Sequence, residues 1–105
     1  MQELTSSGLF EILAALANPH RLQILAALAN ETNYVSQLAR EIGISRPLLT
    51  MHLKRLENAG LVTSNLELSD DGKAMRYYQI SEFDLRLSPK VISTLAKTSG
   101  PFVAE

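Results

Sequence analysis

The chain has 105 residues, a formal net charge of −1 and no cysteine. Its length suits one domain, and a hydrophobic fraction of 46% can bury one modest core. The lack of cysteine excludes a disulfide framework, a thiolate nucleophile and a thiolate metal site. No apolar run approaches the roughly 20 residues of a membrane span, and no signal peptide is visible, so we expect a cytoplasmic protein without a membrane partner.

Two helices are expected at the N-terminal end. Apolar residues at helical spacing predict a first helix over residues 4–17 (Leu9, Ile12, Leu13 and Leu16). Asn18 suits an N-cap and Pro19 suits the first helical position, so a second helix is expected over residues 19–29.

A short helix, a tight turn and a longer helix follow. Asn33 is the expected cap of the third helix, whose apolar positions repeat at helical spacing (Val35, Leu38, Ala39 and Ile42). Gly43 supplies the left-handed conformation that ends this helix, and Ser45 caps the next one. The fourth helix is expected to run from residue 46 to residue 59, with an apolar stripe facing inward (Leu49, His52, Leu53 and Leu56).

The pattern then changes to that of a β-hairpin. Residues 61–68 alternate as a half-buried strand, with Val62, Ser64, Leu66 and Leu68 on one side. The Asp71-Gly72 step predicts a turn within residues 69–73, and residues 74–80 form the returning strand. Residues 82–87 either extend the sheet or form a loop. Ser88 and Pro89 begin a final helix.

This element order predicts a mostly α fold with a small β-hairpin, a winged helix-turn-helix with four helices, two strands and a fifth helix. We expect one domain over residues 1–99, with the DNA-binding part at 34–80, and a flexible tail at 100–105. Two histidines without a neighbouring catalytic group, and scattered acids such as Glu31, Glu41 and Asp84, give no catalytic constellation, so we expect no enzyme.

The outward face of the fourth helix is the candidate site. Arg46, Thr50 and Lys54 recur at i, i+4 and i+8, and Met51 and Arg55 lie one position round. Such a face can enter a major groove, where Arg46 suits a bidentate contact to guanine and later basic residues suit phosphates. With the first turn of the helix and the wing, the expected DNA-binding residues are Ser45, Arg46, Pro47, Thr50, Met51, Lys54, Arg55, Lys73 and Arg76.

Two features favour a different reading, in which the same fold is a protein-interaction module that does not read DNA. The net charge is not basic, whereas a nucleic-acid-binding domain usually is. Asp70 and Asp71 at the wing tip are unfavourable next to phosphate, although turn formation alone explains acidic residues at such positions. Exposed Lys and Arg on a helix are also common without any DNA contact.

Four segments resemble the ArsR-like family of bacterial and archaeal winged-helix repressors. LANPHRLQIL (residues 16–25) is similar to that family's LADPTRLRIL, and LAREIGIS (38–45) to LAEALGLS. TMHLKRLENAGLV (50–62) is similar to SHHLKVLREAGLV, and residues 72–80 resemble the end of the family's wing. The resemblance spans residues 9–80 and implies a sequence-specific regulator of double-stranded DNA, a dimeric repressor.

The resemblance also implies a homodimer on a palindromic operator, with the interface formed by the first and last helices at residues 4–17 and 88–98. The implied interface residues are Leu9, Phe10, Leu13, Val91, Ile92 and Leu95. Some of these side chains would otherwise simply fill the core of the monomer.

The chain departs from the metal sensors of this family. Tyr34, Val35 and Ser36 stand where those sensors carry a Cys-Val-Cys segment, and residues 91–97 lack their Asp/His set. We therefore expect no metal and no cofactor, and the sequence does not identify a small-molecule effector.

Overall fold

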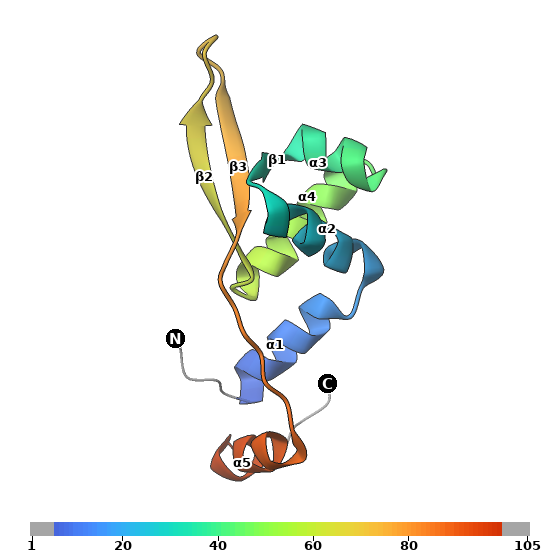
Figure 1. Cartoon of the computed structure of the whole chain (residues 1–105), viewed down its shortest axis with the longest axis vertical. Helices are drawn as coiled ribbons and strands as arrows, with labels where there is room; N and C mark the ends of the chain where they lie inside the picture. The colour runs from blue at the N-terminus through green and yellow to red at the C-terminus, as the bar shows by residue number, and fades with distance from the viewer. Residues whose placement is uncertain (1–5, 100–105) are drawn as a thin grey trace.

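The computed structural model describes residues 6–99, which form five helices and a three-stranded sheet (Figure 1). The winged helix-turn-helix class is confirmed. In chain order the elements are α1 (Ser6–Leu16), α2 (Pro19–Asn30), β1 (Asn33–Tyr34), α3 (Val35–Ile42), α4 (Arg46–Asn58), β2 (Val62–Leu68), β3 (Ala74–Ile80) and α5 (Pro89–Ser99). The expected tail at 100–105 and the start of the first helix at 4–5 lie outside the described residues.

The core lies where α2, α3 and α4 meet the base of the hairpin. Its most deeply buried side chains are Ile24, Leu38, Leu49, Leu53, Leu56, Leu61 and Val62. The Asn18 side chain accepts a hydrogen bond from the Arg21 amide at 3.2 Å and so caps α2, with Pro19 in its first turn. Both local predictions for this helix start are confirmed.

The sheet contains one strand that the sequence did not predict. Its order is β1-β3-β2, antiparallel throughout, and β1 pairs Asn33 with Tyr78 and Tyr34 with Tyr77. The prediction that Asn33 caps α3 is therefore wrong. Asn33 is a buried strand residue whose Oδ1 accepts from the Tyr34 amide at 2.9 Å, and the N-cap position belongs to Tyr34, which makes no side-chain cap bond.

The hairpin of β2 and β3 extends well beyond the core (Figure 1). Its register pairs Val62 with Ile80 at the base and Leu68 with Ala74 at the far end. Only the base of β2 packs on the core, because Leu66 and Leu68 are 62% and 76% exposed. The prediction of a half-buried strand thus holds at Val62 and is wrong for the outer half.

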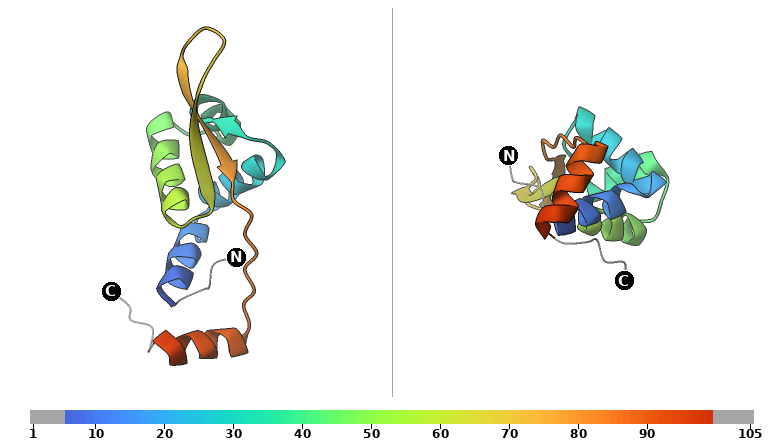
Figure 2. Two further views of the ribbon diagram at one scale, coloured as in Figure 1. Left: turned by 90° about the vertical axis from the view of Figure 1, so that its left-hand side faces the viewer. Right: turned by 90° about the horizontal axis from the view of Figure 1, so that it is seen from below.

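The C-terminal segment leads away from the core. Residues 81–88 form no helix or strand, which settles the open choice in favour of a loop. Ser88 Oγ then accepts from the Val91 amide at 3.1 Å, so the predicted cap of α5 is confirmed. Figure 2 shows α5 beyond the N-terminal end of α1, remote from the wing. The molecule is consequently elongated, with extents of 54 × 25 × 23 Å.

Within residues 6–99, no single helix is long and apolar enough to cross a membrane. Gly8–Leu16 and Pro19–Asn30 pass that test of length and composition only as a pair, and the chain bends by 93° between them.

Candidate DNA-binding surface

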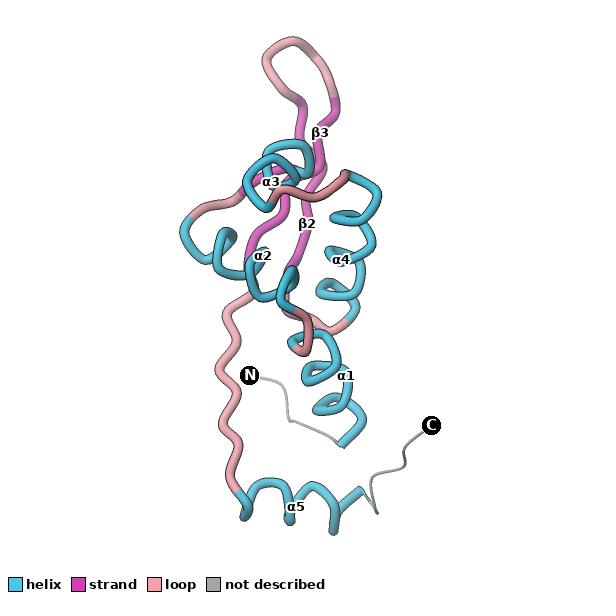
Figure 3. The backbone as a smooth tube through the Cα atoms, turned by 90° about the vertical axis from the view of Figure 1, so that its right-hand side faces the viewer, coloured by secondary structure: helices cyan, strands magenta, loops and turns pink. Residues whose placement is uncertain are grey.

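A three-residue turn fixes the angle between α3 and α4 (Figure 3). Gly43 has φ +81° and donates its amide to Ala39 O at 2.8 Å, which ends α3 in the left-handed conformation that glycine adopts without steric cost. Ser45 Oγ accepts from the Leu48 amide at 3.3 Å and caps α4. Ile44, half-buried between them, packs against the core. The predicted helix-turn-helix corner is confirmed in detail.

The two sides of α4 differ as the periodicity predicts. Leu49, Leu53 and Leu56 are fully buried, and His52 joins them on the inner side. The expected DNA-binding residues of this helix and its cap are all exposed: Ser45, Arg46, Pro47, Thr50, Met51, Lys54 and Arg55. A helix anchored by four buried side chains holds such a polar face in one orientation.

His52 is anchored by Arg21, which is buried on α2. Arg21 donates from Nε to Ala15 O at 2.6 Å and from Nη2 to Ala14 O at 3.1 Å, so it binds the carbonyl end of α1. Its Nη1 lies 3.1 Å from His52 Nδ1. One guanidinium group therefore joins α1, α2 and α4, and the negative end of the α1 dipole compensates its charge.

This contact determines the state of the His52 ring. A guanidinium nitrogen can only donate, so His52 Nδ1 is the acceptor and the neutral ring carries its proton on Nε2. Burial, together with the charges of Arg21, His20 and Arg55, lowers the pKa of His52. The His20 ring meets the His52 ring edge-on with centroids 5.6 Å apart. The interpretation of His52 as a satisfied packing residue agrees with this geometry.

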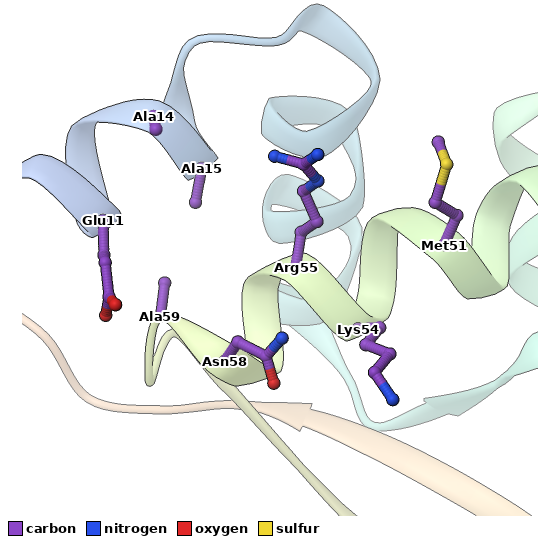
Figure 4. Close-up of a pocket in the computed structure, with 8 residues that line it drawn as sticks. All are labelled: Glu11, Ala14, Ala15, Met51, Lys54, Arg55, Asn58 and Ala59. Atoms are coloured by element: carbon purple, nitrogen blue, oxygen red, sulfur yellow. The ribbon is translucent and has the colours of Figure 1, made fainter. Parts of the chain in front are cut away.

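The structure separates two basic residues that the sequence grouped together. Figure 4 shows Arg55 directed toward the junction of α1 and α2, whereas Lys54 points to the other side of α4. Met51, Lys54, Arg55 and Asn58 line a cleft between α1 and α4. Lys54 shares a face with Arg46 and Thr50 by its helical spacing and lies at the edge of the cleft, whereas Arg55 points into the space between the helices (Figure 4).

The wing tip is shaped by its own side chains. Asp71 accepts from the Ser69 hydroxyl and, at 3.3 Å, from the Lys73 amide, and the Ser69 hydrogen bond chiefly lowers the pKa of Asp71. Gly72 adopts φ +84° beside it. Asp71 therefore has a structural role in the turn. Its presence at the wing tip is explained by turn formation and is no strong evidence against DNA binding.

The two basic residues of the wing are in different settings. Lys73 is exposed in the loop, while the Arg76 side chain is tethered to the adjoining strand. Arg76 Nη1 donates to Ser64 Oγ at 3.0 Å, and Ser64 Oγ donates to Glu57 Oε2 of α4 at 3.1 Å. Both wing cations lie outside the core, separate from the first turn of α4.

The expected interface residues on α1 and α5 are brought together by the fold. Leu9 and Leu95 are buried within the chain, and Val91 is half-buried. Phe10, Leu13 and Ile92 remain 44%, 39% and 42% exposed. The set therefore divides into residues that join α1 to α5 and residues that form an apolar surface.

Sequence reasoning missed one residue important to the site, Arg21. Arg21 lies within the LANPHRLQIL segment, and nothing in a charged residue at that position indicates burial. Among residues 6–99, no group of three or more His, Cys, Asp or Glu side chains is arranged to hold a metal ion.

The capped turn, the anchored helix with its polar face, and the hairpin beyond it define a winged helix-turn-helix. A family model described as bacterial regulatory protein, arsR family, matches residues 18–64. An HTH-type transcriptional regulator of Methanocaldococcus jannaschii, described as uncharacterized, is 38% identical over 81 residues, which cover 77% of this chain and 84% of that protein. The regulator CmtR of Mycobacterium tuberculosis is 32% identical over 105 residues, covering 98% and 86%.

A solved structure has the same arrangement. It is the homodimeric winged helix-turn-helix DNA-binding domain of a possible ArsR-family transcriptional regulator from Mycobacterium bovis. The TM-score is 0.64 at 25% identity, covering 93% of this chain and 86% of that one.

The chain belongs to the ArsR family. It is accordingly a transcriptional regulator with a winged helix-turn-helix DNA-binding domain, and not an enzyme. Membership decides between the two functional classes that the composition had left open, because it selects DNA over a purely protein partner.

Proposed function

We propose that the chain acts as a homodimeric repressor that reads a palindromic DNA operator. Residues 45–59 enter the major groove, and the wing at 69–76 contacts the flanking groove or backbone. The observation that carries this proposal is the exposed face of Arg46, Thr50 and Lys54 on a helix whose other side is fully buried. The cytoplasm, where bacterial and archaeal DNA resides, is the proposed place of action.

The residues of this surface have different tasks. Arg46, in the first turn of α4, reaches a guanine O6 and N7 edge through its planar fork. Thr50 and Met51 present methyl groups suited to thymine. Lys54 and Arg55, further along the helix, neutralise phosphates, which positions the protein without reading sequence.

The ends of the surface contact the DNA backbone. Ser45 and Pro47 form the start of α4, where backbone amides and the helix dipole favour a phosphate. Lys73 and Arg76 of the wing provide positive charge beside the operator half-site. A local cluster of this kind allows phosphate binding although the net charge of the chain is −1.

A homodimer doubles this surface. The homodimeric state of the Mycobacterium bovis domain supports it, as does the exposed apolar surface of Phe10, Leu13 and Ile92. Two reading helices about 34 Å apart would meet successive major grooves on one side of the duplex, which requires a two-fold symmetric operator. A dimer seated on such an operator excludes RNA polymerase from an overlapping promoter.

Selection of bound fragments from random DNA, followed by two substitutions, tests the reading surface. Arg46→Ala should remove the preference for one base position at a cost of about 1–3 kcal/mol. Lys54→Ala should weaken all sequences equally and reduce the salt slope of the dimer by roughly 1.8, which is 0.9 for the phosphate lost in each half-site. Arg40→Ala on α3 is the matched control, since Arg40 is also exposed but lies off this face. Unchanged affinity of both α4 variants at low salt would exclude α4 as the reader.

Transcription in vitro tests the sign of regulation. A promoter that overlaps the selected operator should lose activity as the protein is added, and Arg46→Ala should restore it. An increase in transcript with the wild-type protein would identify an activator and contradict the repressor proposal while leaving the DNA contacts intact.

A further inference from the structure

A cleft between α1 and α4 combines an apolar floor with two cations, Lys54 and Arg55. It encloses about 470 Å³, and its lining includes Glu11, Ala14 and Ala15 of α1, Met51 and Arg55 of α4, and Ala59 at the α4 C-cap. The methyl groups of three alanines and the Met51 thioether provide small and adaptable apolar contacts. Figure 4 shows the three alanine methyl groups and Arg55 bordering one space between the helices.

Arg55 is the polar group that distinguishes this cleft. Within residues 6–99, no carboxylate or carbonyl accepts a hydrogen bond from its guanidinium group. The nearby Arg21 already uses the carbonyl end of α1, at Ala14 O and Ala15 O, to balance its own charge. Burial and then the Arg55 charge lower the pKa of Arg21, so the two guanidinium groups repel each other.

The lining of the cleft carries Lys54, Arg55 and Glu11, a net charge of +1, which favours a single negative charge in the ligand. An anion on Arg55 gains a charge-assisted, bidentate partner and relieves the repulsion between Arg55 and Arg21. Glu11 on the α1 side makes no ion pair with Arg55 within residues 6–99, and its carboxylate would repel a second anionic group. The other titratable groups on this side are Lys54 of α4 and, packed behind Arg21, His52 and His20.

The cleft adjoins the surface proposed for dimerisation. Leu9 and Leu13 lie on nearly the opposite side of α1 from Glu11, Ala14 and Ala15 by the 3.6-residue period, whereas Phe10 is four residues before Ala14 and lies beside it. A ligand in the cleft would therefore lie next to the apolar side through which the dimer is proposed to form, and not within it.

We propose that this cleft binds an organic monocarboxylate with a compact apolar body, the carboxylate on Arg55 and the body against Ala14, Ala15, Ala59 and Met51. The ligand bridges α1 and the recognition helix. If Arg55 also binds a DNA phosphate, a point that rests on the proposed function, the ligand and the operator compete for it and the ligand releases DNA.

Titration of the isotope-labelled full chain, without DNA, tests the site directly by amide NMR shifts. The probes are benzoate and its neutral isostere benzamide. Benzoate should give saturable shifts concentrated at Ala14, Ala15 and Ala59, and benzamide should bind about tenfold or more weakly, because it lacks the charge-assisted contact.

Two substitutions should change benzoate affinity in opposite directions. Arg55→Gln should weaken it about tenfold or more, and Glu11→Gln should strengthen it several-fold by removing the like charge. Arg86→Gln, an exposed cation in the loop before α5, is the control and should have no effect. Neither Glu11 nor Arg86 belongs to the proposed DNA surface.

Equal affinity for benzoate and benzamide, no saturable shift with benzoate, or equal loss in Arg55→Gln and Arg86→Gln would overturn the site. A separate DNA titration then measures the coupling. Benzoate should raise the DNA dissociation constant of the wild-type chain but not that of Arg55→Gln. Because ligand binding is measured without DNA, the titration still decides whether the cleft binds benzoate even if the operator proposal proves wrong.

Discussion

His52 illustrates how one side chain links the pH to the stability of the reading helix. Its Nδ1 accepts from Arg21, so protonation would place a second donor against the guanidinium group and leave a cation buried beside another. The native state therefore disfavours the charged ring, and burial is the first cause of the lowered pKa.

The sign of the pH dependence follows from linkage. Because the folded-state pKa of His52 lies below its unfolded value of about 6.5, the unfolded chain binds more protons and stability rises with pH. The stability is fully present above about pH 6.5 and is lost as the pH falls below that value toward the folded pKa. Urea unfolding of the wild type at pH 7 and pH 5 should show this loss, and His52→Gln should show a smaller one.

The control is His20→Gln, because His20 packs on His52 without bonding to Arg21. It should retain most of the wild-type slope. An equal slope in the wild type and His52→Gln would mean that another group causes the dependence. Asp71, whose pKa is also lowered, loses its contribution only at pH values below about 4 and is outside this window.

Arg21 should contribute more to stability than any exposed arginine. Arg21→Met preserves much of the aliphatic bulk but leaves Ala14 O and Ala15 O without their donor. The expected loss is about 1.5–3 kcal/mol in the free energy of unfolding, the range for hydrogen bonds to charged groups. Arg86→Met, at an exposed loop position, should cost less than about 0.5 kcal/mol. Similar losses for the two variants would contradict the view that Arg21 holds α1, α2 and α4 together.

The sequence located His52 but not its partner. The 3.6-residue period places His52 on the inner stripe of α4 directly, because spacing within one helix determines which side chains share a face. Arg21 lies 31 residues earlier, on another helix, and only the packing of the two helices creates the contact. A charged residue in a helical pattern is ordinarily assigned to solvent, so burial of Arg21 could not be foreseen.

At the scale of elements, the corner before α4 depends on the backbone of Gly43. A Cβ built there would meet nothing within 4 Å, so the obstacle to substitution is the φ of +81° and not the available space. Gly43→Ala should cost about 1–2 kcal/mol by urea unfolding. Gly43→Asn should cost less, because asparagine tolerates this conformation. An alanine variant as stable as the wild type would show that the turn can relax.

The hairpin should be stable without its outer apolar residues. Leu68 is 76% exposed, so Leu68→Thr should change the free energy of unfolding by less than about 0.5 kcal/mol. Val62→Ala, at the buried base of the same strand, should cost about 1–3 kcal/mol. Chemical unfolding of both variants is the measurement. A large effect at Leu68 would mean that the outer hairpin packs on something in solution.

The sequence predicted correctly those elements whose boundaries depend on neighbouring residues, such as helices that begin at a capping side chain. Caps at Asn18, Ser45 and Ser88 each satisfy amides within three residues, so the helix starts were found from sequence. The strand β1 has only two residues, too few for any periodicity, and it exists because β3 offers a free edge. The alternation in β2 correctly gave a strand, but alternation does not reveal how far a core extends along it.

The molecule is more extended than a compact domain of the same length. A compact domain of this size has a radius of gyration of about 13 Å, whereas this chain has 16.0 Å. The difference arises because the hairpin projects at one end and α5 lies beyond the N-terminal end of α1 at the other, with the loop at 81–88 between α5 and the sheet (Figure 1). The α1 and α5 end of the molecule carries the exposed side chains of Phe10, Leu13 and Ile92, which is the surface that we propose packs against a second copy.

A charge placed in that surface should therefore separate the proposed dimer. Ile92→Glu puts a carboxylate on the apolar side of α5, where a partner would have to desolvate it. Light scattering should show a monomer at concentrations at which the wild type is a dimer, with an unchanged helical signal in circular dichroism. Ser93→Glu, the neighbouring exposed position, is the matched control and should remain dimeric.

The same variant also tests how much dimerisation contributes to operator affinity. A monomer of Ile92→Glu retains α4 and the wing, so it should still bind a single half-site weakly. It should lose the additional affinity that a palindrome gives to two linked reading helices. If Ile92→Glu stays dimeric, or if its affinity for the palindrome equals that of the wild type, the α1 and α5 end of the molecule is not the interface. The exposed apolar residues would then need another partner.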